Sequence, residues 1–196
     1  MRRPFMDTPD QLASLEGQQY LVLRPTIGVA SLFREVQDAA LARFGGDIRH
    51  PRTEHATLRA FAEPDRRAEL AALIRRWAAD QHPIEVTAEA VDAFPAPWQV
   101  LIVRLARTAS LVSAYASLSA ALEHTDFQRL DELSVDDWTF HLSVVYGRSL
   151  EPAVWEDFRE ASVSELGRKP TETIVEAELV WYQDGTEHAE LIPLGR

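Results

Sequence analysis

Two short stretches decide the fold: His55-Ala56-Thr57-Leu58 and His141-Leu142-Ser143-Val144. In each stretch a histidine is followed by any residue, then by a residue with a hydroxyl group, and then by an aliphatic residue. The chain has six histidines, and only these two lie in this pattern. Because chance would supply roughly 0.1 such tetrapeptide in a chain of this composition, the pair indicates one site that is built twice.

Both stretches fall in segments with the composition of strands, residues 54–61 and 138–146. Side chains at positions i and i+2 of a strand project from the same face. His55 therefore points with Thr57, and His141 points with Ser143, while the aliphatic residue of each stretch points into a core. Each half of the chain thus offers one imidazole and one hydroxyl to a shared space.

These four side chains suit an attack on phosphorus without a metal ion. Two imidazoles with pKa values near ~6.5 can act as one neutral base and one protonated acid near neutral pH. Two hydroxyls can donate hydrogen bonds to phosphoryl oxygens. We therefore expect His55 and His141 to be catalytic, Thr57 and Ser143 to bind phosphate, and no metal or cofactor; which histidine is the acid stays open.

Helical and strand-like segments surround the two stretches. Further strands are expected at 20–23, 84–91, 98–105, 171–182 and 187–193, and helices at 26–44, 64–82, 110–123 and 151–166, with Thr26 capping the first helix and Gly45-Gly46 ending it. A helix, a histidine-bearing strand and a helix follow one another twice. This order predicts an α+β duplication, with sheets that face each other across a cleft and helices outside.

The domain organisation follows from the same reading. We expect residues 1–17 to be a loosely held terminus and residues 18–196 to form one domain of two pseudo-symmetric lobes. We expect the acidic loop 124–137 to be a lid or an insertion.

Composition narrows the class of protein. The 196 residues are 46% hydrophobic and include no cysteine, which excludes disulfide frameworks and thiolate chemistry. The net charge is −11: the first 107 residues carry 14 basic and 14 acidic side chains, and the rest carry 6 and 17. Such an acidic surface disfavours long nucleic acids. Without an apolar stretch of membrane-spanning length or a signal peptide, we expect a cytoplasmic, monomeric protein that does not bind membranes.

The paired motifs, their separation and the duplicated layout resemble the 2H phosphoesterase superfamily, in particular the bacterial 2'-5' RNA ligase-like proteins. The resemblance extends from Tyr20-Leu21-Val22-Leu23 to Leu179-Val180-Trp181-Tyr182. It implies a bilobal fold with both motifs facing a central groove, and two antiparallel sheets. It also implies opening of a 2',3'-cyclic phosphate on a nucleotide or short RNA end to a 2'-phosphate, with the two histidines as the acid–base pair.

Several alternatives share these residues. The same site would suit cyclic oligonucleotides, an ADP-ribose cyclic phosphate, or 2'-5' ligation, although the acidic second half disfavours ligation of RNA. A non-catalytic nucleotide- or RNA-binding module is a further alternative. Arg59 shares a face with His55 and Thr57 if the strand is regular, so it is a candidate to pair with a substrate phosphate. Tyr146 and Arg148 lie just past the second motif and are further candidates for substrate contacts.

Overall fold

The computed structural model of the protein describes residues 2–44 and 48–195. The expected helix end at Gly45-Gly46 lies outside the described residues. Within the described ranges, five helices and ten strands follow in the order α1 (Pro9–Leu15), β1 (Gln19–Leu23), α2 (Gly28–Phe44), β2 (Ala56–Phe61), α3 (Arg67–Ala79), β3 (Ile84–Phe94), β4 (Val100–Leu105), α4 (Ala109–Glu123), β5 (Arg129–Leu130), β6 (His141–Tyr146), α5 (Pro152–Ser162), β7 (Ser164–Glu165), β8 (Thr171–Ile174), β9 (Glu176–Gln183) and β10 (Thr186–Pro193).

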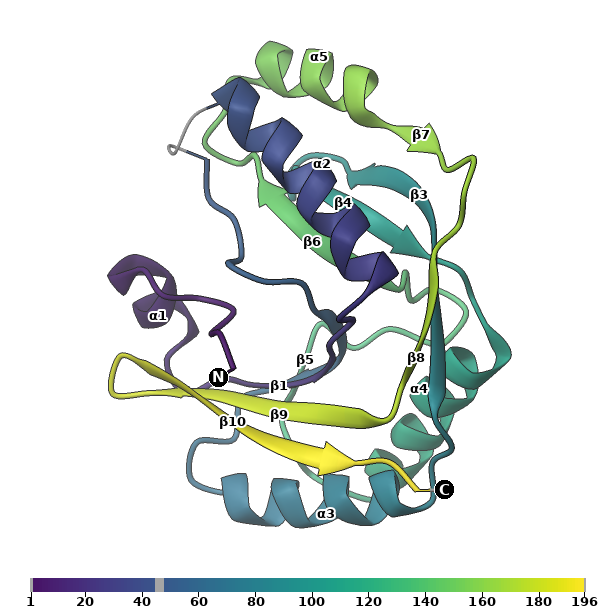
Figure 1. The fold of residues 1–196 in the computed structure, drawn as a ribbon. Coiled ribbons are helices and arrows are strands. Elements are labelled where there is room, and N and C mark those ends of the chain that lie inside the picture. The colour runs from purple at the N-terminus through teal and green to yellow at the C-terminus, as the bar shows by residue number, and fades with distance from the viewer. Residues whose placement is uncertain (1, 45–47, 196) are drawn as a thin grey trace.

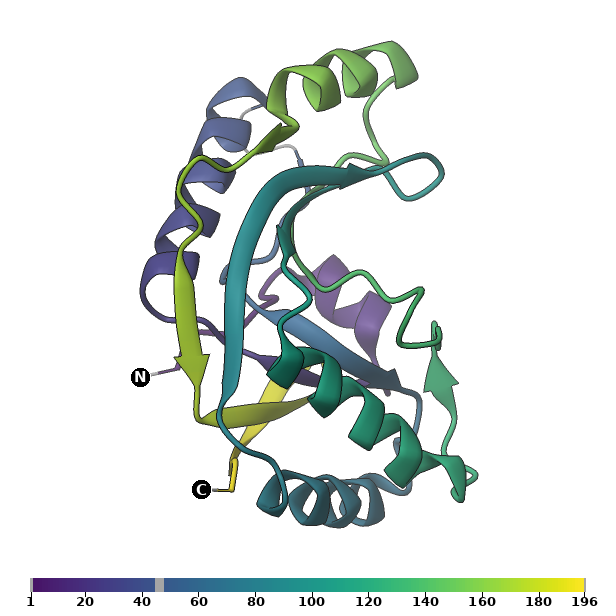
Figure 2. The same ribbon diagram turned by 90° about the vertical axis from the view of Figure 1, so that its right-hand side faces the viewer.

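The protein has a mixed α+β fold with one large antiparallel sheet. The strand order in this sheet is β10-β9-β1-β2-β6-β4-β3-β7. The two halves of the chain meet where β2 pairs with β6 through Ala56 and Leu142. We expected two sheets across a cleft. The structure instead joins them at this short pairing, and Figure 2 shows the long β3 bending as the sheet curves.

Helices cover the outside of the sheet, as predicted. Helices α2 and α5 lie over the half that contains β3, β4 and β6, whereas α3 runs below β10 at the opposite end (Figure 1). Leu58, Leu142 and Val144 are fully buried in the main core. Their burial confirms the inward face of both histidine-bearing strands.

The start of α2 is capped by a residue that is distant in sequence. Glu172 of β8 accepts hydrogen bonds from the backbone amides of Thr26, Ile27, Val29 and Ala30, at 2.6 to 3.3 Å. A buried carboxylate at a helix N-terminus satisfies free N–H groups and complements the helix dipole. The cap is therefore this carboxylate and not the expected Thr26 hydroxyl.

The N-terminal segment differs from the loosely held terminus that the sequence indicated. Residues 9–15 form α1, which Thr8 caps, and Phe5 is only 1% exposed. Glu187 of β10 accepts hydrogen bonds from the backbone amides of Phe5 and Met6. Phe5 and Met6 form a second small core with Val22, Val180 and Tyr182. The polar composition of the segment contains no sign of these long-range partners.

Other boundaries differ from the sequence expectations in smaller ways. The expected strand at 171–182 is divided between β8 and β9, which pair with different strands, β3 and β1. The strand expected from residue 138 begins at His141, and the expected loop 124–137 includes β5, which pairs with β2. These boundaries depend on pairing partners, which the local sequence does not specify.

Candidate active site

A groove of about 670 Å³ lies where the two histidine-bearing strands meet. Four side chains from the two sequence motifs line it: His55, Thr57, His141 and Ser143. The rest of the lining is mainly apolar and aromatic, and consists of Phe5, Met6, Leu15, Tyr20, Val22, Phe94, Trp98, Val100, Asp131, Glu132, Leu133, Trp138, Tyr146 and Tyr182. The structure therefore brings together all four motif side chains that the sequence singled out.

The β2–β6 pairing explains how the motifs are arranged. Ala56 lies opposite Leu142 in antiparallel register. His55 and Thr57 flank Ala56, and His141 and Ser143 flank Leu142. The pairing thus brings the two motifs side by side, in opposite directions, at the seam between the two halves.

Both imidazoles are oriented in the same way. The Nδ1 atom of His55 lies 3.2 Å from the carbonyl oxygen of Thr53, and that of His141 lies 2.8 Å from the carbonyl oxygen of Thr139. A carbonyl can only accept, so each Nδ1 carries the hydrogen. The Nε2 atom of each neutral ring is left as the basic nitrogen, and it is the atom available to a substrate.

An aromatic ring packs against each imidazole. The centroids of Phe5 and His55 are 4.1 Å apart, and those of Phe94 and His141 are 4.8 Å apart in an edge-to-face arrangement. The pKa of His55 is lowered to about 4, mainly by burial, and the nearby Arg24 and His141 contribute to the same shift. Burial also lowers the pKa of His141. Both rings are therefore neutral at pH 7 in the free protein.

Tyrosines extend the site beside Ser143. Burial raises the pKa of Tyr146, and a hydrogen bond with Ser143 opposes that shift. Burial likewise raises the pKa of Tyr20, with smaller contributions from Tyr146 and Asp131. The hydroxyl of Tyr182 donates to Glu187 at 3.1 Å. This row places neutral phenol groups along the groove, where they can donate or accept hydrogen bonds.

Of the three additional candidates, only Tyr146 lines the groove. Arg59 is buried, and its guanidinium donates to the hydroxyls of Tyr115 and Ser119 and lies 3.8 Å from Glu132. The hydroxyl of Tyr115 in turn donates to the carbonyl oxygen of Leu133 at 2.8 Å. Arg59 thus supports segment 131–133 from behind, which corrects its expected place on the groove face. Arg148 is exposed beyond the end of β6 and outside the lining.

The aromatic lining could not be predicted from the sequence. Phe5 comes from the N-terminal segment, Phe94 and Trp98 flank the turn between β3 and β4, and Trp138 precedes β6. The turn at residues 94–97 is rich in proline, yet nothing in the local sequence indicates that it reaches His141. Within residues 2–44 and 48–195, no group of three His, Asp or Glu side chains could hold a metal ion, and no helix has the length and apolar character to cross a membrane.

Comparisons with known proteins agree with this architecture. The family model described as the 2'-5' RNA ligase superfamily matches residues 28–186. The chain therefore belongs to the 2'-5' RNA ligase superfamily, a group of 2H phosphoesterases, as the paired motifs indicated. Comparison with curated protein sequences gives no significant match.

Solved structures show the same fold at low sequence identity. TT0787 of Thermus thermophilus is 16% identical over 91% of this chain and 99% of its own, with a TM-score of 0.66. LigT of E. coli, in complex with NADP+, is 14% identical over 92% of this chain and 99% of its own, with a TM-score of 0.59. Usb1 of Kluyveromyces marxianus is 8% identical over 92% of this chain and 100% of its own, with a TM-score of 0.54. At these identities the likeness establishes the fold.

Proposed function

We propose that this protein is a metal-independent phosphodiesterase that opens a 2',3'-cyclic phosphate on a nucleotide or short RNA end to a 2'-phosphate. The observation that carries the proposal is the pairing of two His-x-Thr/Ser strands, which sets two Nε2 atoms and two hydroxyls on one groove. The protein acts as a cytoplasmic monomer in this proposal.

The reaction needs one proton removed and one delivered. One imidazole takes a proton from water as the water oxygen bonds to phosphorus. The bond from phosphorus to the 3'-oxygen breaks, and the other imidazole gives its proton to that oxygen. Thr57 and Ser143 donate hydrogen bonds to the non-bridging oxygens, whose charge grows as the fifth bond forms. After the reaction one histidine has gained a proton and the other has lost one, and both return to their starting states by exchanging protons with solvent.

We assign the base to His55 and the acid to His141. The Phe5 ring packs against the His55 ring, and the Arg24 guanidinium lies 4.0 Å from the centroid of the Phe5 ring. Both features favour a neutral His55. Bound phosphate favours protonation of an imidazole beside it. The pKa of His141 is lowered by burial and not by a cation among the described residues, so His141 is the ring that gains the proton more readily.

The test is hydrolysis of a 2',3'-cyclic mononucleotide in the presence of EDTA, with the position of the product phosphate determined by ³¹P NMR. The proposal predicts a nucleoside 2'-phosphate as the sole product and no effect of EDTA. Formation of the 3'-phosphate, or a rate that EDTA abolishes, would contradict it. A substrate panel of cyclic oligonucleotides and 2'-5'-linked dinucleotides separates hydrolysis of the cyclic phosphate from the alternative reactions.

A further inference from the structure

Aromatic side chains form much of the groove lining. Seven of its lining residues are Phe, Tyr or Trp, and they come from five separate places in the chain: Phe5, Tyr20, Phe94 with Trp98, Trp138 with Tyr146, and Tyr182. Trp98 is 56% exposed at the turn between β3 and β4. An exposed indole on the rim of a groove is a surface on which a planar group can stack.

The charged side chains of the lining, apart from the two histidines, are carboxylates. Glu132 is neutralised by Arg129 at 3.1 Å and by Arg59 at 3.8 Å. Asp131 has no ion-pair partner among the described residues. It lies close enough to Tyr20 to act on the ionisation of that phenol. Asp131 therefore places an uncompensated negative charge on the same groove as His55 and His141.

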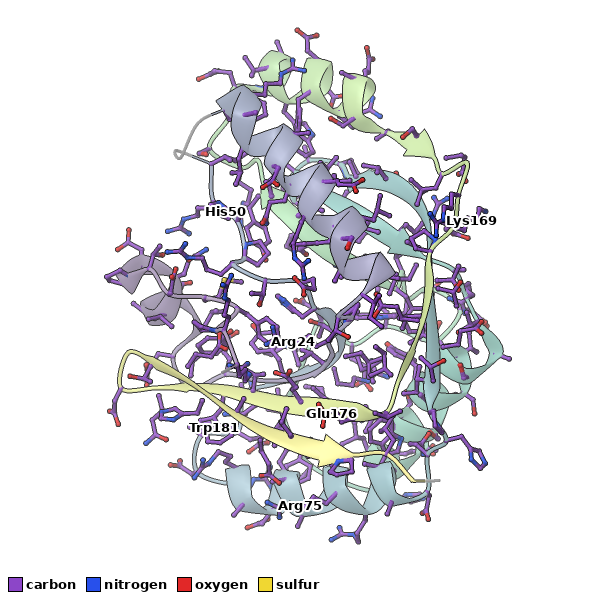
Figure 3. All side chains as sticks on the ribbon, viewed as in Figure 1. Arg24, His50, Arg75, Lys169, Glu176 and Trp181 are labelled. Atoms are coloured by element: carbon purple, nitrogen blue, oxygen red, sulfur yellow. The ribbon has the colours of Figure 1, made fainter. Side chains whose placement is uncertain are left out.

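The basic side chains that contact Phe5 of the lining, Arg2 and Arg24, are already paired with a carboxylate. Arg24, labelled near the middle of the molecule in Figure 3, pairs with Glu178 at 2.6 Å. Arg75 and Lys169 lie at the periphery in the same view, and Arg75 pairs with Glu190 at 2.6 Å. Within the described lining, a single phosphate can therefore contact the two imidazoles and the hydroxyl groups. A second phosphate on the same ligand would meet the carboxylate of Asp131.

We propose that the groove selects ligands with a single phosphate group and an uncharged aromatic group, that Trp98 stacks on this aromatic group, and that Asp131 disfavours a second phosphate. This inference deepens the proposed function and rests on it. It favours a cyclic mononucleotide without a 5'-phosphate over one that carries a 5'-phosphate, and it disfavours oligonucleotides whose further phosphates would lie beside Asp131.

The test measures binding by calorimetry, so that it does not depend on turnover. The ligands are a nucleoside 2'-monophosphate and the corresponding 2',5'-bisphosphate. Like charges at close range in a partly solvated groove predict that the bisphosphate binds more weakly, on the order of fivefold. Asp131→Asn should bring the two affinities together. The backbone of Asp131 has φ 48, a conformation that asparagine adopts readily, so the substitution changes the charge and keeps the shape.

Asp136→Asn is the matched control, because it removes the same charge from the same acidic segment outside the groove lining. It should keep the wild-type ratio of affinities. A bisphosphate that binds the wild type as tightly as the monophosphate, or a ratio that Asp131→Asn leaves unchanged, would overturn the inference. Failure of the protein to bind either nucleotide would also overturn it.

Trp98→Ala tests the stacking component separately. It should weaken binding of the nucleoside 2'-monophosphate about tenfold and leave binding of ribose 2'-phosphate, which has no base, unchanged. Equal loss for both ligands would contradict stacking on the base. Hydrolysis of the cyclic nucleotide is assayed in parallel: a protein that shows these binding ratios without turnover would retain the selectivity and lose the proposed hydrolysis.

Discussion

At the scale of single residues, the site is built from two imidazoles whose surroundings are related but unequal. Each Nδ1 lies beside the carbonyl oxygen two residues earlier, and each ring packs against a phenylalanine. The surroundings of the two imidazoles differ at Phe5, because the Phe5 ring also contacts the Arg24 guanidinium. The motif histidines could be predicted from the sequence, whereas Phe5 could not, because no local pattern connects it to a histidine so distant in the chain.

Phe5→Ala should raise the pKa of His55 from about 4 toward the ordinary value, because water then reaches the ring. NMR titration of the His55 ring measures this directly. If His55 is the base, the acidic limb of the pH–rate profile moves to higher pH in the same variant. Phe44→Ala, which removes a phenylalanine that packs against Phe158 away from the groove, should leave both unchanged. A His55 that still titrates near pH 4 in Phe5→Ala would contradict the account.

The lowered pKa of His55 also links stability to pH. The unfolded chain binds a proton at this residue as the pH falls below about 6.5, while the folded protein does not until about 4. Protonation therefore favours unfolding, and the free energy of unfolding should fall by about 2 kcal/mol between about pH 7 and pH 5 from this group. Urea denaturation of wild type and His55→Asn at both pH values measures it. Equal pH dependence in the two proteins would exclude this linkage.

At the scale of elements, local pattern predicted most helices and strands, and tertiary partners set their ends. The apolar residues Leu32, Phe33 and Val36 follow one another at helical spacing, which predicts helix α2 from the local sequence. Its cap is nevertheless the carboxylate of Glu172, which is held by the pairing of β8 with β3. Such a cap is invisible in a sequence window around the helix, because the residue comes from more than 140 positions away.

Glu172→Gln should lower the free energy of unfolding by about 1–3 kcal/mol, because a neutral amide has one acceptor oxygen for four backbone donors and no charge for the helix dipole. Glu176→Gln removes the same charge from an exposed position nearby, labelled in Figure 3, and should have little effect. Chemical denaturation of the three proteins provides the comparison. Similar losses in both variants would indicate that the charge, and not the cap, matters.

At the scale of the whole molecule, the seam between the two halves is the functional feature. The duplicated order of elements predicted two lobes with a site between them, and the family match and solved structures agree with that fold. The sequence did not show that the sheets join through Ala56 and Leu142, because strand order is set by long-range pairing. That pairing brings the two motifs together on one groove, and Phe5 and Met6 of the N-terminal segment form part of the groove lining.

The central claim is that both imidazoles act on one phosphorus as a unit, and single and double substitutions test it most directly. Turnover of a 2',3'-cyclic mononucleotide is measured for wild type, His55→Ala, His141→Ala and the double variant, with folding of each checked by circular dichroism. General acid–base catalysis predicts that each single variant loses about 10²–10⁴ in kcat, and groups that act together predict that the double variant loses little more than a single one. Wild-type turnover in either folded single variant would contradict the account.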